Sequence, residues 1–181
     1  MNEPGTVAHM LKALPTRGNY TLIISLAAPV YIKISDLGMF GFKKGYYAYT
    51  GSAMGEGAVD LRHRIARHLR ERKTKHWHID YLLASQKAGI TAIVTCSTSA
   101  NEECKITRSV QSMEGASVPV DGFGASDCRE GCGSHLVYCG LDNILGKIVA
   151  IHRRIAKKAN VVYRILESND TQTDGKNAAN N

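Results

Sequence analysis

The sequence predicts an α/β fold of the α+β kind, in which helices flank a small central antiparallel or mixed β-sheet. Strand-forming residues are concentrated near the N-terminus, at 20–26, 29–33 and 46–50. Leu61, Ile65 and Leu69 then recur at every fourth position, which is typical of an amphipathic helix. The later part of the chain alternates between helical and extended patterns.

The first part of the chain predicts a short helix followed by three strands. The helix is expected at 8–14. Residues 20–26 are rich in β-formers and residues 29–33 resume the extended pattern after a brief break, so we expect a hairpin. Gly38, Gly41 and Gly45 mark turns before a third strand at 46–50. These three strands are expected to form a small antiparallel sheet.

The second part of the chain begins with a basic amphipathic helix at 59–73. The elements expected after it are a helix at 77–86 that ends before Gly89, a strand at 90–96, a helix at 101–113 capped by Ser99, a loop at 115–133, a strand at 134–139, a helix at 141–159 and a strand at 161–166.

Length and composition predict one domain of ordinary size. The chain has 181 residues, of which 44% are hydrophobic and 22% charged, close to the averages of globular proteins. We expect this domain to occupy 1–167, with a core at about 18–138 and a C-terminal helix and strand at 141–166. Residues 168–181 are almost devoid of apolar side chains, which predicts a disordered polar tail.

Two observations predict a cytoplasmic protein. The longest apolar run, 22–32, is interrupted by Ser25 and Pro29 and is shorter than the ~20 residues of a membrane-spanning helix, and the N-terminus lacks the pattern of a signal peptide. The five cysteines are an odd number, which fits reduced thiols better than a disulfide framework.

The net charge of +7 indicates an acidic partner, either nucleic acid or an anionic membrane surface. Residues 60–75 hold seven basic and two acidic side chains, so the charge is concentrated in one patch. A second basic segment covers 153–158. Both segments would give salt-dependent affinity for a nucleic-acid backbone.

Two pairs of side chains are candidates for a site. Tyr47 and Tyr49 lie two apart on the predicted third strand and must point to the same side, whereas Tyr46 points to the other. Arg64 and His68 lie four apart on the basic helix and can act on one phosphate. The alternative is that the tyrosines pack in the sheet and that the basic side chains form a solvated face.

The order of these elements resembles a known family of nucleases. Gly18-Asn19-Tyr20, Tyr49-Thr50-Gly51-Ser52-Ala53 and the string from Asp60 to His68 are similar to the core motifs of the GIY-YIG nuclease superfamily. The strings at 76–83, 102–104, 122–128 and 134–136 resemble a branch of that superfamily in archaea and some bacteria, sometimes fused to an endonuclease III-like repair glycosylase. The resemblance covers about 18–138 and implies a GIY-YIG-like fold.

The resemblance implies a catalytic face built around two tyrosines. Tyr20 and Tyr49 would lie beside the scissile phosphate, and Tyr20 would help to deprotonate the attacking water. Because a phenol has a reference pKa of ~10, a neighbouring cation would have to favour its charged form. Arg64 would neutralise charge on the phosphate. His68 would contact a phosphate oxygen or protonate the leaving group, or else be a surface histidine.

The resemblance also implies one divalent ion, Mg²⁺ or Mn²⁺, held by a single glutamate. Glu103 is the expected ligand and the adjacent Glu102 the alternative. Two positions depart from the superfamily pattern, Asn19 and Thr50. Both are middle positions of their motifs, so their side chains face away from the side of the flanking tyrosine and the catalytic groups remain.

A further set of side chains is expected to contact nucleic acid or to shape the site. The expected contacts come from the basic patch and the histidines that follow it: Arg62, Arg67, Arg70, Lys75, His76 and His78. Asp80 could orient a neighbouring histidine, and Trp77 is expected in the core.

Cys128, Cys132, His135 and Cys139 have a spacing that suits tetrahedral zinc. The alternative is that Asp127, Cys128, Ser134 and His135 brace the loop near the active face.

These expectations together predict a divalent-metal-dependent endonuclease that hydrolyses phosphodiester bonds of DNA, or of RNA, at a structure or damaged site in repair or recombination. Two alternatives stay open. One is a nucleic-acid-binding module that has kept the fold and lost turnover. The other is a zinc-braced adaptor of a repair glycosylase, which would bind zinc and cleave nothing.

Overall fold

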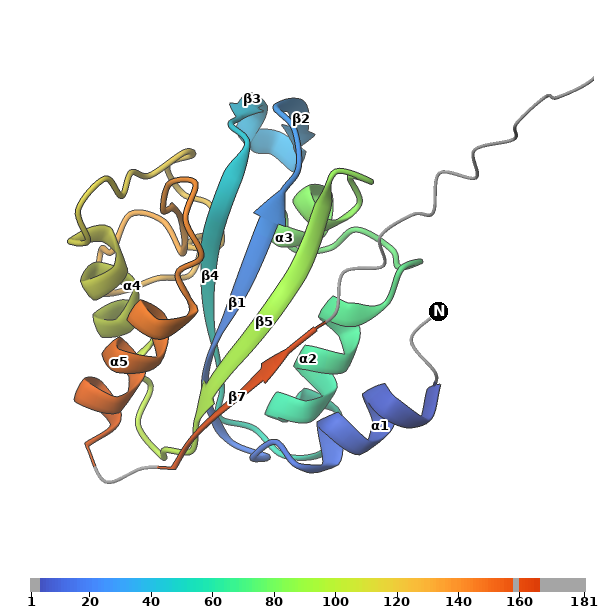
Figure 1. The fold of residues 1–181 in the computed structure, drawn as a ribbon, viewed down its shortest axis with the longest axis vertical. Coiled ribbons are helices and arrows are strands. Elements are labelled where there is room, and N and C mark those ends of the chain that lie inside the picture. The colour runs from blue at the N-terminus through green and yellow to red at the C-terminus, as the bar shows by residue number, and fades with distance from the viewer. Residues whose placement is uncertain (1–3, 158–159, 167–181) are drawn as a thin grey trace, which may run out of the picture.

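The structure is a computed structural model that describes residues 4–157 and 160–166. Helices cover both faces of a twisted sheet, so the described chain has three layers (Figure 1). Helices α1, α2 and α3 lie on one face, and α4 and α5 lie on the other. The described chain therefore has the mixed α+β architecture that the sequence predicts.

The described residues form five α-helices and seven strands. The helices are α1 (Pro4–Lys12), α2 (Leu61–Leu69), α3 (His78–Leu83), α4 (Glu103–Gln111) and α5 (Leu145–Ala156). The strands are β1 (Gly18–Leu26), β2 (Val30–Ile34), β3 (Gly38–Phe42), β4 (Gly45–Ala53), β5 (Ala88–Cys96), β6 (Leu136–Tyr138) and β7 (Val161–Ile165). The main sheet has the order β6-β4-β1-β5-β7, and every neighbouring pair is antiparallel.

Strand β1 is the centre of the sheet and separates two cores. Leu22 and Ile24 face α2 and α3, whereas Ile23 between them packs with the side chains of α4 and α5. Nearly every residue of β1 is buried, because both its edges are paired and both its faces are covered by helices.

The predicted hairpin between residues 20–26 and 29–33 is wrong. Strand β1 pairs with β4 and β5, so neither of its edges is free for β2. Instead β2 pairs with β3 in a separate two-stranded sheet, although Gly38 and Gly41 in β3 were expected to mark turns only. This small sheet extends beyond one end of the main sheet (Figure 1).

Four helices, α2 to α5, are shorter than the sequence predicts. Asp60 caps α2 by accepting a hydrogen bond from the His63 N–H at 2.8 Å, and extended backbone at Arg70 ends the helix. The expected cap of α4, Ser99, is wrong, because Asn101 accepts the hydrogen bond from the Glu103 N–H at 3.0 Å. Helix α5 begins only at Leu145.

The predicted alternation of the tyrosines is confirmed. Tyr47 and Tyr49 belong to the core beneath α2 and α3, and Tyr46 packs against the opposite core. Among the described helices, none combines the length and the apolar character that a bilayer crossing requires. The predicted tail at 168–181 lies outside the described residues.

Candidate functional site

A cleft of about 410 Å³ opens where the N-terminal end of β1 meets the C-terminal end of β4. Its walls come from β1, β4, α2, the segment before α3, the start of α4 and the loop before β6. The lining residues are Tyr20, Tyr49, Gly51, Ser52, Arg64, His76, Trp77, His78, Asn101, Glu103, Gly124, Ser126 and Asp127. Six residues that the sequence analysis selected are therefore gathered in one cavity: Tyr20, Tyr49, Arg64, His76, His78 and Glu103.

The cleft lies around a free stretch of the β4 edge. Strand β6 pairs only with Tyr47 to Tyr49 of β4. Beyond Tyr49, the residues of β4 alternate between the two faces, so Gly51 and Ser52 point in opposite directions. Because the cleft is lined by both, groups from opposite layers of the fold reach the same cavity.

Tyr20 and His68 form a buried pair in the wall of the cleft. The Tyr20 hydroxyl lies 2.9 Å from His68 Nε2, at hydrogen-bond distance. Burial raises the pKa of the Tyr20 phenol well above its ordinary value, although the Arg64 guanidinium acts in the opposite direction. Burial, with the Lys73 ammonium next, lowers the pKa of His68 to about 3. Near neutral pH both groups are therefore uncharged.

This pairing changes two expectations. The reading of His68 as a surface histidine is wrong, because its side chain is 2% exposed. His68 reaches the cleft through Tyr20 and does not line it. Arg64 is the cation that the expected ionisation of Tyr20 requires, but burial of the phenol outweighs it.

Gly51 makes room for the Tyr20 ring. The two residues are partners in the register of β1 and β4. A Cβ atom at position 51 would overlap the ring and hydroxyl of Tyr20. Since Tyr20 is buried, its ring has no free space to retreat into. Glycine at this position therefore lets the phenol lie flat across β4.

Glu103 is held in the first turn of α4 by contacts to both carboxylate oxygens. Ser52 Oγ donates a hydrogen bond to Oε2 at 2.8 Å, and His135 Nδ1 lies 2.8 Å from Oε1. A carboxylate has about four acceptor positions, so the Glu103 side chain keeps capacity for an ion. Glu102 does not line the cleft and pairs with Lys105 at 2.6 Å.

Asn19 fastens the start of α4 to β1. Its side chain is fully buried, donates to the Ala100 carbonyl at 3.0 Å and accepts from the Glu102 N–H at 3.0 Å. These two bonds hold the segment that delivers Glu103 to the cleft. The Asn19 side chain therefore links the central strand to the start of α4 on this side of the sheet.

Arg67 and Asp80 form an ion pair behind the cleft. Two guanidinium nitrogens of Arg67 donate to the two carboxylate oxygens of Asp80, each at 2.8 Å. Asp80 also accepts from the backbone N–H groups of His76 and Trp77, both at 2.9 Å. The expectation that Asp80 orients a histidine side chain is not met for His76, because the bond is to its backbone.

The residues expected to contact nucleic acid fall into different environments. His76 and His78 line the cleft, and His78 Nδ1 accepts from the Gly124 N–H at 3.0 Å. Arg62 and Arg67 are engaged within the fold, Arg62 with the Leu14 carbonyl at 2.7 Å. Arg70 and Lys75 are exposed, and Lys75 lies over the Tyr81 ring. Of the second basic segment, Arg153 and Arg154 belong to α5, which lies on the opposite face of the sheet.

A second cluster of side chains lies behind Glu103. One ligand atom from each of Cys104, Cys128, Cys132 and His135 lies within 4.8 Å of the others, so these residues could hold a metal ion. The expected set is wrong in one member. Cys139 donates to the Val137 carbonyl at 3.5 Å and is not in the group, and Cys104 takes its place.

The sequence matches a described family. A profile of the family described as Domain of unknown function DUF123 matches residues 19–157. The chain belongs to this family. Nothing matches among curated proteins or among solved structures. The DUF123 match spans all the residues that line the cleft and all four residues of the second cluster.

Three residues inside the DUF123 match were missed as site residues by the sequence analysis. Ser52 and Asn19 position Glu103 and the start of α4, and Cys104 completes the second cluster. Cys104 is next to Glu103 in the sequence, but it lies 24 residues from Cys128. A search for ligands at short spacing therefore selects Cys139, which is nearer than Cys104 to Cys128 along the chain.

Proposed function

We infer that the cleft binds and hydrolyses a phosphodiester bond of nucleic acid, as the resemblance to GIY-YIG nucleases suggests. The observation that supports this most is the meeting of Tyr20, Tyr49, Arg64 and Glu103 in one cavity. These residues come from two strands and two helices, and the resemblance implies all four as site residues. A phenol can take part in proton transfer, a guanidinium can bind a phosphate and a carboxylate can hold a divalent ion, so together these groups suit metal-assisted phosphoryl transfer.

Arg64 is the group best suited to hold the phosphate. It lines the cleft and no acidic side chain pairs with it among the ion pairs of the described residues. A guanidinium forms two parallel hydrogen bonds to phosphate oxygens and strengthens them as negative charge develops.

Glu103 fits one Mg²⁺ or Mn²⁺ ion. Its carboxylate faces the cleft, is 17% exposed and keeps free acceptor positions. Magnesium binds through one carboxylate together with water and phosphate oxygens. When bound, the ion would supply charge neutralisation and a more acidic water.

Tyr20 and His68 offer a route for the proton of the attacking water. The water oxygen forms a bond to phosphorus while the bond from phosphorus to the leaving oxygen breaks. The water proton passes to the Tyr20 oxygen as the phenol proton passes to His68 Nε2, and the leaving oxygen takes a proton from solvent. The lowered pKa of His68 disfavours its charged form near neutral pH, so His68 would hold this proton only transiently and return it through Tyr20 to solvent. No stable phenolate is then required.

A panel of labelled duplex, single-stranded, flap and branched DNA, with matching RNA, tests this proposal. With Mg²⁺ or Mn²⁺ present we expect wild type to cleave at least one member, and Arg64→Ala and Glu103→Ala to cleave none. Equal binding of all three proteins without cleavage by any would contradict hydrolysis and favour a nucleic-acid-binding module. Cleavage by either variant would show that the residue substituted in it is not needed for the reaction.

A further inference from the structure

The cluster behind Glu103 consists of three sulfurs in mutual contact and one imidazole. Cys104 Sγ lies 3.3 Å from Cys128 Sγ and 3.3 Å from Cys132 Sγ, and the latter two lie 3.2 Å apart. A disulfide has its sulfurs about 2.05 Å apart and joins two of them, which leaves the third without a partner. Tetrahedral zinc with Zn–S bonds of about 2.3 Å brings three sulfurs to about 3.8 Å from one another. The triangle of sulfurs matches a zinc site much better than a disulfide.

His135 adds an independent observation. Its side chain is 4% exposed, yet neither ring nitrogen makes a hydrogen bond of good geometry with the described protein. Nδ1 lies 2.8 Å from Glu103 Oε1, close enough for an ion pair. A buried imidazole without proper partners is costly, because its polar atoms have lost water. A metal ion bound to Nε2 would remove that cost and would turn the Nδ1–H toward Glu103.

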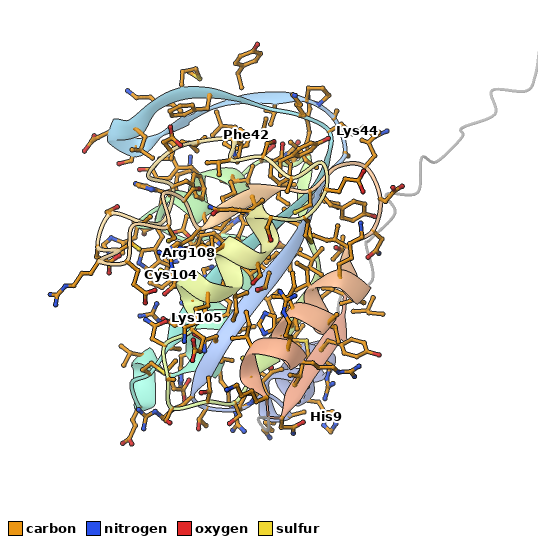
Figure 2. The ribbon with its side chains drawn as sticks, turned by 90° about the vertical axis from the view of Figure 1, so that its left-hand side faces the viewer. His9, Phe42, Lys44, Cys104, Lys105 and Arg108 are labelled. Carbon is orange, nitrogen blue, oxygen red and sulfur yellow. The ribbon has the colours of Figure 1, made fainter. Side chains whose placement is uncertain are left out.

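The cluster also joins two segments that are distant in the sequence. Cys104 lies in the first turn of α4, and the other three residues lie in the loop at 115–135 that precedes β6. Figure 2 shows Cys104 and Arg108 one turn apart on α4, and both contact this loop, Arg108 through the Glu130 carbonyl. A loop of this length without strands of its own needs such attachments to keep one conformation.

We propose that Cys104, Cys128, Cys132 and His135 bind one Zn²⁺ ion. His135, fixed by this ion, then holds the Glu103 carboxylate in position. Three cysteines and one histidine form a closed tetrahedral shell, which is the composition of structural zinc sites. A zinc-bound histidine commonly donates its other ring N–H to a carboxylate, which fixes both groups. This zinc ion would have a structural role beside the cleft, and it is distinct from the Mg²⁺ or Mn²⁺ ion proposed at Glu103.

Zinc binding is tested on the purified full chain by elemental analysis and by cobalt substitution. We expect one zinc per chain, and with Co²⁺ the intense visible and near-ultraviolet bands of tetrahedral cobalt thiolate. Cys104→Ser and Cys132→Ser should lose the metal, whereas the matched control Cys139→Ser should keep it. Absence of zinc after growth and refolding with zinc would overturn the proposal. Loss in Cys139→Ser with retention in Cys104→Ser would overturn the ligand set.

X-ray absorption of the zinc-loaded wild type keeps the test independent of how the variants fold. We expect three sulfur ligands at about 2.3 Å and one nitrogen at about 2.0–2.1 Å. A shell of oxygen and nitrogen ligands would overturn the proposal.

The link to Glu103 rests on the proposed function and has its own readout. Mn²⁺ binding, followed by electron paramagnetic resonance, is compared between zinc-loaded wild type, zinc-depleted wild type and zinc-loaded Glu103→Gln. We expect Mn²⁺ affinity to fall about 10–100-fold when zinc is removed and to return when zinc is restored. Equal affinity with and without zinc would overturn the link alone. A protein that binds zinc but neither Mn²⁺ nor substrate would contradict the proposed function and the link to Glu103. The zinc site itself would still be supported by this result.

Discussion

The Tyr20 hydroxyl lies 2.9 Å from His68 Nε2, across 48 residues of sequence and between the central strand and the basic helix. Both side chains are almost fully buried, and neither is charged near neutral pH. Under the proposed function, Tyr20 and His68 would therefore act as a pair, and Tyr20 would not act as a single phenolate.

Tyr20→Phe should abolish cleavage with little effect on nucleic-acid binding. The substitution removes the only atom of Tyr20 that can carry a proton and keeps the ring. We expect the single-turnover cleavage rate to fall by about 10²–10⁴-fold. Binding, measured by fluorescence anisotropy, should change little because contacts to the backbone phosphates supply most of it.

Tyr47→Phe is the matched control for this variant. Tyr47 is also buried in the same core, but its hydroxyl donates to the Lys43 carbonyl at 2.7 Å and is not part of the cleft. It should lose about 1 kcal/mol of stability and keep its cleavage rate. Equal rates in Tyr20→Phe and Tyr47→Phe would exclude proton transfer through Tyr20.

Gly51→Ala should displace the Tyr20 ring. The added methyl group overlaps the ring and hydroxyl, and the buried ring cannot move without disturbing its neighbours. We expect a loss of about 1–3 kcal/mol in the free energy of unfolding, measured by urea denaturation, together with a loss of cleavage. Gly89→Ala in β5 is the control, since a Cβ there meets no atom within 4 Å. Similar stabilities for the two variants would contradict the steric argument.

Arg67→Ala and Arg70→Ala should separate a structural arginine from one that binds nucleic acid. Arg67 pairs with fully buried Asp80, so its loss leaves the buried carboxylate with only the more distant Lys73 ammonium, at 3.9 Å, and we expect a stability loss of about 3 kcal/mol. Arg70 is exposed, so Arg70→Ala should leave stability unchanged and lower the slope of log affinity against log salt by about 1. Thermal unfolding and salt-dependent binding provide the two measurements. A loss of stability in Arg70→Ala, with a change only in the salt dependence of binding in Arg67→Ala, would contradict these two roles.

Acid should destabilise the fold through His152. This residue is fully buried, its Nε2 lies 2.8 Å from Thr21 Oγ1, and burial lowers its pKa to about 4. The unfolded chain therefore takes up a proton at a higher pH than the folded chain does. The contribution of His152 is complete above pH ~6.5 and is lost as the pH falls toward about 4, by a total of roughly 3 kcal/mol.

Urea denaturation at several pH values measures this effect. His152→Gln retains an amide that can bond Thr21 but does not titrate, so its stability should depend less on pH between 6.5 and 4. His9→Gln, at an exposed position, should follow wild type. An unchanged pH dependence in His152→Gln would show that acid acts elsewhere.

The sequence by itself determined the kinds and the order of most elements, with β3 as the exception. The fourfold spacing of Leu61, Ile65 and Leu69 predicted α2, and the alternation at 90–96 predicted β5, because these periods depend on local geometry. The residue pattern of a strand does not reveal which neighbouring strands pair with its two edges. Strand β1 was therefore predicted in a hairpin with β2, although β4 and β5 occupy both its edges.

The tertiary structure alone decided how the site is completed. The resemblance selected Tyr20, Arg64 and Glu103 as site residues, but the sequence could not show that His68 lies behind Tyr20. The choice of Cys104 over Cys139 depends on the path of a long loop back to α4. Sequence patterns report neighbours within a turn or along a strand, whereas packing brings distant side chains together to bury apolar surface. The partners of Glu103 and the members of the cysteine cluster are set by that packing.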